Sequence, residues 1–256
     1  MELTAGQQEQ LIEEGYVRLP GAVPADLVAR ARRAINASLG ERGIDPEQLP
    51  IYRARSYCPE LQHDSVITDL YNASKAREIA EAAIGPGKVR QIGGGQIALR
   101  FPTMSDPRPP HPHIDGMYTP TNGVPPGTIA NFTALVGVFL SEIPHDDMGN
   151  FSVWPGSHRT LQAYFREHGP QSLLEGFPPV ELGEPLQLHA APGDAVLCHY
   201  QLAHGIAGNG SPFVRYGIFF RLAHVEHESV HWECMTDIWR EWEGISRPGT
   251  LPGGTG

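Results

Sequence analysis

The sharpest local feature of the chain is a histidine and an aspartate two positions apart, His113 and Asp115, which could bind a metal together. In an extended segment, residues two apart point to the same side, so an imidazole and a carboxylate can converge on one point. With a second histidine from elsewhere, they would form the two-histidine, one-carboxylate triad that holds iron(II) and leaves positions open for substrate and O₂. The pair alone is weak evidence for a metal site, because a chain with 12 histidines and 29 acidic residues contains such pairs by chance.

The second histidine of the triad is expected to be His204. Residues 192–194 (Pro-Gly-Asp) predict a turn, the apolar run at 195–198 predicts a strand, and His204 follows shortly afterwards, directly before Gly205. A turn, a strand and a histidine in this order can present a metal ligand at the mouth of a barrel.

An arginine eleven residues beyond His204 could recognise a dicarboxylate. Arg215 falls in the next predicted strand, and a buried guanidinium can hold a carboxylate through two parallel hydrogen bonds, which a lysine cannot do. Arg221 is an alternative, because its even spacing from Arg215 permits the same face of the strand. The residues alone leave this choice open.

Five motifs follow one another along the chain in a fixed order. They are His113-x-Asp115, Gly149-Asn150 leading to Trp154-Pro155-Gly156-Ser157-His158, Gly193-Asp194, His204-Gly205, and Arg215. In this order and at these spacings they resemble the phytanoyl-CoA dioxygenase family of iron(II)- and 2-oxoglutarate-dependent oxygenases. The opening of the chain, with a helix ending at Glu14-Gly15-Tyr16 before a hydrophobic strand, is also similar, so the resemblance covers roughly residues 8 to 225.

The resemblance implies a fold, a set of cofactors and a reaction. The fold is mainly β with flanking helices, a double-stranded β-helix or cupin-like jelly roll. Iron(II) would be held by His113, Asp115 and His204, and the far carboxylate of 2-oxoglutarate by Arg215. The expected reaction consumes O₂, decarboxylates 2-oxoglutarate to succinate and oxidises an unactivated C–H bond of a small-molecule substrate.

The presence of Asp115 narrows the reaction. Relatives that halogenate lack the carboxylate ligand, which leaves room for chloride on the iron. With Asp115 present that position is filled, so hydroxylation is favoured over chlorination. Desaturation and oxidative ring closure stay open, because they begin with the same hydrogen abstraction.

Further polar and aromatic residues are expected inside the site. The expected contacts to 2-oxoglutarate, in addition to Arg215, are Asn131, Thr133 and Gln96. The expected contacts to substrate are Arg100, Tyr118 and Trp154. The segments 102–112 and 118–126 are long and contain little regular secondary structure. They are therefore predicted to act as lids that exclude water.

Three other histidines have simpler interpretations than metal binding. His111 is expected to line a loop. His199 stands an odd number of residues before His204 and is interpreted as a hydrogen-bonded core histidine, with orientation of a ligand as the alternative. His158 is expected to support the sheet. The acidic stretch 145–147 is predicted to be a solvated turn.

The elements that must position these residues change character along the chain. The first third predicts helices, of which the first is capped by Thr4 and Gln7. Expected helices cover 25–39, 65–84, 160–168 and, as a closing helix with three tryptophans, 224–243; expected strands cover 16–19, 89–101, 133–140, 149–154, 195–199 and 213–222. Short strands with such boundaries are typical of a sandwich or barrel. We expect one domain over residues 1–246 and a disordered tail at 247–256.

The composition excludes several classes of partner. A net charge of −10 argues against nucleic acid and against an anionic membrane surface. No apolar stretch approaches the roughly 20 residues that span a bilayer, and the first ten residues do not form a signal peptide. Three cysteines without a paired pattern indicate free thiols in a reducing cytoplasm. A cytoplasmic enzyme is therefore expected, and its oligomeric state is not predicted.

Two other functions use the same features. Zinc accepts the same ligand set, which would make the chain a hydrolase, although hydrolysis needs no dicarboxylate anchor such as Arg215. A jelly roll without catalysis would be a binding protein, although a complete triad argues against it. As substrate we favour a small polar metabolite, such as an intermediate of secondary-metabolite biosynthesis, over an acyl-CoA, because no basic patch beside the site would hold the CoA phosphates.

Overall fold

Two antiparallel sheets form the centre of the protein in the computed structural model, which describes residues 2–245. The larger sheet has the strand order β1-β6-β3-β8-β2, and the smaller sheet has the order β5-β4-β7. The strands are β1 (Tyr16–Leu19), β2 (Gln96–Arg100), β3 (Ala134–Phe139), β4 (Phe151–Val153), β5 (Leu186–Gln187), β6 (Ala195–His199), β7 (His204–Ile206) and β8 (Arg215–Leu222). The predicted tail at 247–256 lies outside the described residues.

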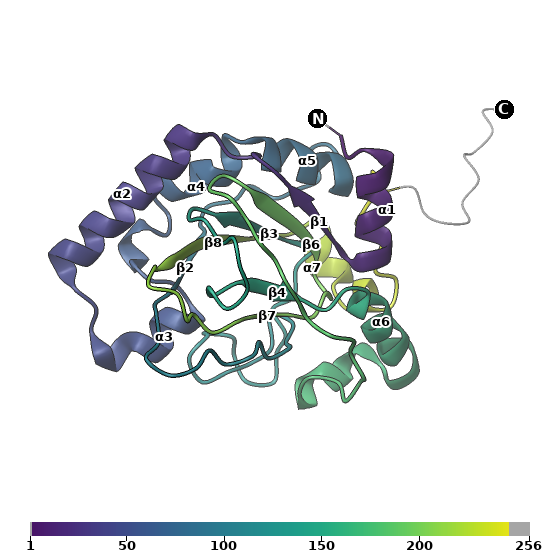
Figure 1. Cartoon of the computed structure of the whole chain (residues 1–256). Helices are drawn as coiled ribbons and strands as arrows, with labels where there is room; N and C mark the ends of the chain where they lie inside the picture. The colour runs from purple at the N-terminus through teal and green to yellow at the C-terminus, as the bar shows by residue number, and fades with distance from the viewer. Residues whose placement is uncertain (1, 246–256) are drawn as a thin grey trace.

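Helices lie before, between and after the strands along the chain. The α-helices are α1 (Ala5–Glu14), α2 (Ala25–Arg42), α3 (Leu49–Ala54), α4 (Ser65–Asn72), α5 (Lys75–Ile84), α6 (Ser157–His168) and α7 (His227–Val230). Short 3₁₀ helices are η1 (Pro46–Gln48), η2 (Pro59–Leu61), η3 (Pro170–Glu175) and η4 (Glu233–Met235). Figure 1 shows α2, α4 and α5 along one side of the larger sheet, with β4 and β7 on the other. In the described part, no helix is both long and apolar enough to cross a membrane.

The central strand β3 shows how the layers are held together. All six of its residues are buried. Ala134, Val136 and Val138 pack into the core under the helices, whereas Leu135 and Phe139 pack into a second core between the two sheets. This alternation is the period of two of a strand. Because both faces are covered, β3 appears in the sequence as a continuous apolar run.

The N-terminal helices bury one stripe each against the larger sheet. In α2 this stripe is Leu27, Ala31 and Ile35, which recur every four residues on one face. The helix predicted over 65–84 is instead two helices, α4 and α5. Ser74 separates them in an extended conformation, and its hydroxyl donates to the carbonyl of Tyr71. A serine that bonds locally in this way competes with the helical pattern.

The segment predicted as one closing helix at 224–243 folds into α7, η4 and turns. Its turns bring Glu241 back to β3, where the buried carboxylate accepts hydrogen bonds from Thr133 (2.7 Å) and His227 (2.9 Å). Trp242 is buried and stacks on His199, with 5.7 Å between ring centroids. A straight helix would not allow these contacts, which place Trp242 in the core.

Two buried histidines outside the cavity make the fold sensitive to acid. His158 Nε2 donates to the carbonyl of Ile12 at 3.0 Å, and His199 Nε2 donates to that of Ile238 at 2.8 Å, so both support the packing as predicted. Burial lowers the pKa of His158 to about 3 and that of His199 to about 4. In the unfolded chain a histidine has a pKa of about 6.5.

We therefore expect the free energy of unfolding to decrease as the pH falls below about 6.5, because the unfolded chain then binds more protons than the folded one. The full contribution of His158 and His199 is present above that pH. At pH 5, each of these two histidines lowers the free energy of unfolding by roughly 2 kcal/mol relative to neutral pH. Urea denaturation between pH 7 and pH 5 measures this loss, which His199→Gln should reduce and the exposed His168→Gln should not. A stability that does not change over this range would contradict the prediction.

Candidate metal centre

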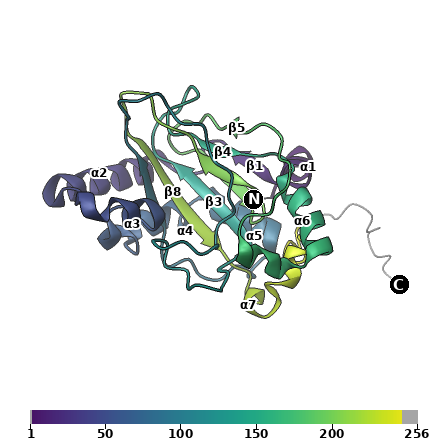
Figure 2. The ribbon, with the colours of Figure 1, turned by 90° about the horizontal axis from the view of Figure 1, so that it is seen from below.

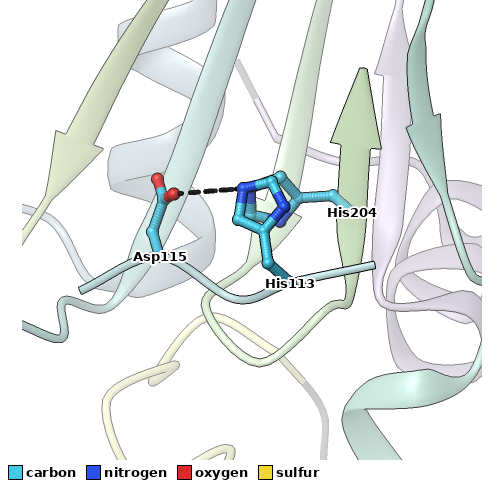
Figure 3. A group of neighbouring side chains, drawn as sticks. All are labelled: His113, Asp115 and His204. Atoms are coloured by element: carbon cyan, nitrogen blue, oxygen red, sulfur yellow. Dashed lines mark ion pairs between the residues drawn. The ribbon is translucent and has the colours of Figure 1, made fainter. Parts of the chain in front are cut away.

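Three side chains from two distant segments of the chain meet at one point. The metal-binding atoms of His113, Asp115 and His204 all lie within 4.8 Å of one another, and Figure 3 shows the three side chains turned toward each other. Asp115 Oδ1 lies 3.7 Å from Nε2 of each histidine. Ligand atoms about 2.1 Å from a shared ion are about 3 Å apart, so a small contraction would close this group around a metal.

Backbone pairing brings the two histidines together. His113 and His204 exchange two backbone hydrogen bonds of 3.0 and 2.9 Å, which extend the smaller sheet beyond β7. Gly205 permits this approach, because a Cβ there would lie 2.5 Å from the carbonyl oxygen of His111. His204 Nδ1 donates to the carbonyl of Leu202 at 3.0 Å. Its Nε2 therefore carries the lone pair that a metal needs.

The two oxygens of Asp115 have different partners. Oδ1 faces the histidines, while Oδ2 accepts from Arg221 Nε at 3.0 Å and lies 2.7 Å from a second guanidinium nitrogen. Burial by itself would raise the pKa of Asp115, but the Arg221 guanidinium and the two histidines hold it well below its usual range. The carboxylate is thus ionised, with one oxygen left for a metal.

Arg221 is consequently not available as the alternative clamp for 2-oxoglutarate. It also donates to Gln96 Oε1 at 2.8 Å, so Gln96 supports Arg221 at the cavity wall, and its contact with 2-oxoglutarate stays a prediction. The chain Gln96–Arg221–Asp115 orients the carboxylate toward the histidines. Outer partners of this kind hold a ligand in its binding orientation.

Replacing Arg221 by Met should weaken iron(II) binding by roughly 10- to 100-fold, the usual effect of losing an outer partner of a metal ligand. Asp115 would then rotate freely and lose its strongest neighbouring charge. Anaerobic titration of the protein with iron(II) measures the change. Arg90→Met removes an exposed arginine that pairs with the exposed Glu228 and serves as the control. Equal iron affinity in the two variants would show that Arg221 does not support the site.

The three residues lie in the wall of a cavity of about 610 Å³. His111, which was expected to line a loop, also lines the cavity, and so do Arg100 and Tyr118, whose contact with substrate stays a prediction. Both predicted lid segments border the cavity. One of them is tied to the end of α3, because Arg55 Nε donates to the carbonyl of Thr121 at 3.1 Å.

Arg215 is a buried charge in this cavity without a carboxylate partner. Its side chain is held by Nε donating to the carbonyl of Gly149 (2.7 Å) and by a terminal nitrogen donating to that of Ala98 (3.0 Å). Burial and the neighbouring Arg100 lower the pKa of Arg215 to about 9, so it stays protonated at neutral pH. Among residues 2–245 no acidic side chain pairs with it. A buried unpaired charge is costly, which indicates an anionic ligand.

Three predicted contact residues lie elsewhere. Asn131 Nδ2 donates to the carbonyl of His231 at 2.8 Å, and the hydroxyl of Thr133 donates to Glu241. Both face the C-terminal segment, which covers the start of β3, and neither lines the cavity. Trp154 is buried outside the cavity lining as well. These predictions are corrected, because strand position alone does not reveal which segment covers a residue.

Arg53 lines the cavity and was not predicted. It lies on α3, a helix of six residues that is too short to produce a clear apolar period. Phe151 and Phe219, which also line the cavity, lie 5.3 Å apart between ring centroids and come from opposite sheets. No sequence signal joins these residues.

Comparison with known proteins agrees with this geometry. The sequence model described as phytanoyl-CoA dioxygenase (PhyH) matches residues 11–217. The chain belongs to the phytanoyl-CoA dioxygenase family. The enzymes of this family are oxidoreductases, and this family member is one of them. A search of the curated proteins gave no match.

Several solved protein structures are similar in fold to this chain. HygX from Streptomyces hygroscopicus with nickel and 2-oxoglutarate bound has a TM-score of 0.57 and 17% identity, covering 88% of each chain. EctD from S. alaskensis with bound iron has a TM-score of 0.55 and 19% identity, covering 88% of this chain and 78% of EctD. The carbocyclase SnoK from nogalamycin biosynthesis has a TM-score of 0.54 and 18% identity, covering 90% of each chain.

Proposed function

We propose that this family member hydroxylates an unactivated C–H bond of a small molecule, with iron(II) held by His113, Asp115 and His204 and 2-oxoglutarate held by Arg215. The buried guanidinium of Arg215, without a carboxylate partner in the described residues and in the same cavity as the triad, is the observation that supports this assignment best. A zinc hydrolase on the same triad would have no use for it. The fold we infer is the double-stranded β-helix, supported by the two antiparallel sheets with the triad beside them.

Different residues of the chain have different roles in the proposed reaction. When bound, the iron supplies the activation of O₂ with electrons from 2-oxoglutarate, which becomes succinate and CO₂. Arg215 orients the cosubstrate through its far carboxylate, because the bonds to Gly149 and Ala98 fix the guanidinium plane. Asp115 fills a ligand position with one oxygen, which favours hydroxylation over halogenation. The two lid segments would keep water out.

The size and composition of the cavity support a small-molecule substrate. A volume of about 610 Å³ must accept both 2-oxoglutarate and substrate, which is within the range of small-molecule pockets. The carbocyclase SnoK and the epimerase SnoN, which has a similar fold, both come from nogalamycin biosynthesis. For this chain we propose an intermediate of secondary-metabolite biosynthesis as substrate class.

Succinate formation tests the proposal. Protein reconstituted with iron(II) should convert 2-oxoglutarate and O₂ to succinate slowly without substrate and faster with it. The reaction should stop when iron is omitted or replaced by zinc. Iron-loaded protein that binds 2-oxoglutarate but never forms succinate would refute an oxygenase, and hydrolysis with zinc would favour the alternative.

A further inference from the structure

Arg100 is a second arginine in the cavity wall that has no partner. Its Nε is buried and makes no hydrogen bond, and no ion pair joins its side chain to another residue within 2–245. A guanidinium carries five donors and stays charged, so leaving it unpaired in a partly buried position is costly. The position therefore needs a reason beyond packing.

Like charges surround Arg100. It stands directly opposite Arg215 in the antiparallel register of β2 and β8, and like charges directly opposite each other destabilise a sheet. Gly149 makes room for both, since a Cβ there would lie 2.8 Å from Arg100 and 3.3 Å from Arg215. Burial lowers the pKa of Arg100, and the nearby Arg53 lowers it further.

The charges of the whole cavity wall are unbalanced. Four arginines line it, and Asp115 is the only acidic side chain that does so among the described residues. Asp115 is paired with Arg221, and 2-oxoglutarate would take Arg215. Because iron(II) carries two positive charges and 2-oxoglutarate two negative ones, binding both leaves the excess of positive charge in the cavity unchanged. Arg100 and Arg53 therefore stay without a counter-charge after every known component is in place.

We propose that Arg100, with Arg53 at the rim, binds an anionic group of the substrate, a carboxylate or a phosphate. This inference rests on the proposed function, in which Arg215 binds 2-oxoglutarate and Arg100 is left for the substrate. Apolar side chains from both sheets, among them Leu135, Phe151 and Phe219, also line the cavity. The substrate class is thus a small acid whose carbon body lies against these side chains while its acidic group faces Arg100.

Anion binding to the protein already loaded with iron(II) and 2-oxoglutarate tests this subsite. Under anaerobic conditions, acetate and inorganic phosphate are titrated separately and followed by calorimetry. The wild type should bind at least one of them, and Arg100→Met should weaken that binding at least about tenfold. Arg53→Met should weaken it less, and the exposed Arg90→Met should leave it unchanged. Preference for acetate assigns a carboxylate, and preference for phosphate assigns a phosphate.

The same variants separate this proposal from the proposed function. In Arg100→Met, the charge-transfer absorbance of the iron–2-oxoglutarate chelate should appear at the same 2-oxoglutarate concentration as in the wild type. A shift as large as that of Arg215→Ala would place Arg100 on 2-oxoglutarate and overturn the subsite. Anion binding that is absent in the wild type, or equally strong in the wild type and in Arg100→Met, also overturns it. Failure of the proposed function is different: wild-type protein would form neither the chelate nor succinate.

Discussion

The Asp115→Ala protein is expected to lose iron(II) affinity by at least about 100-fold and to form no measurable succinate, while its fold survives. The loss exceeds that of an outer partner because a ligand itself is removed. The substitution also leaves Arg221 as an uncompensated positive charge beside the site, since its ion pair with Asp115 is broken. That charge would repel a divalent cation.

A double variant separates these two effects of losing Asp115. Asp115→Ala with Arg221→Met removes both the ligand and the repelling charge, so it should recover part of the iron affinity without recovering turnover. Iron content per chain and succinate formation are the two measurements, and circular dichroism checks the fold. Wild-type turnover in Asp115→Ala would mean that a different carboxylate completes the triad.

The second large effect is expected at Arg215. Replacing it by Ala should raise the 2-oxoglutarate concentration needed for half-maximal succinate formation by roughly 30- to 1,000-fold, which corresponds to about 2–4 kcal/mol of lost charged hydrogen bonding. Iron content should stay at the wild-type level, because Arg215 makes no contact with the three candidate ligands. Succinate formation measured against 2-oxoglutarate concentration gives the shift.

Arg215→Lys is the informative companion. A lysine keeps the charge, but it has no planar pair of donors and cannot hold the carbonyls of Gly149 and Ala98 while binding a carboxylate. It should therefore rescue little of the 2-oxoglutarate affinity. Full rescue by Lys, or an unchanged requirement in Arg215→Ala, would move the cosubstrate away from Arg215.

The elements that the sequence predicted well are those with a strong local pattern. β1 and β6 have the predicted bounds, and α1 has the predicted capping box of Thr4 and Gln7. Turn residues and apolar runs set these elements locally. β5, β7 and α3 were missed, because two, three or six residues contain too little periodicity.

The candidate site shows the same division between local and distant information. The spacing of His113 and Asp115 on one segment, and the position of His204 between a strand and a glycine, determined the proposed ligand set, and the structure brings these three residues together. The choice between Arg215 and Arg221 needed the structure, which pairs Arg221 with Asp115. Asn131 and Thr133 were expected to face 2-oxoglutarate, but their side chains hydrogen-bond to the C-terminal segment that covers them.

The three candidate ligands with which the sequence began were predicted from residue types, from their spacing and from the family resemblance that the motifs carry. Only the tertiary structure decided how many positive charges meet beside them. Arg53, Arg100 and Arg215 are far apart in the sequence and form no basic run. The register of β2 against β8 and the packing of α3 bring them to one cavity wall. Such pairing depends on long-range contacts, which no local pattern encodes.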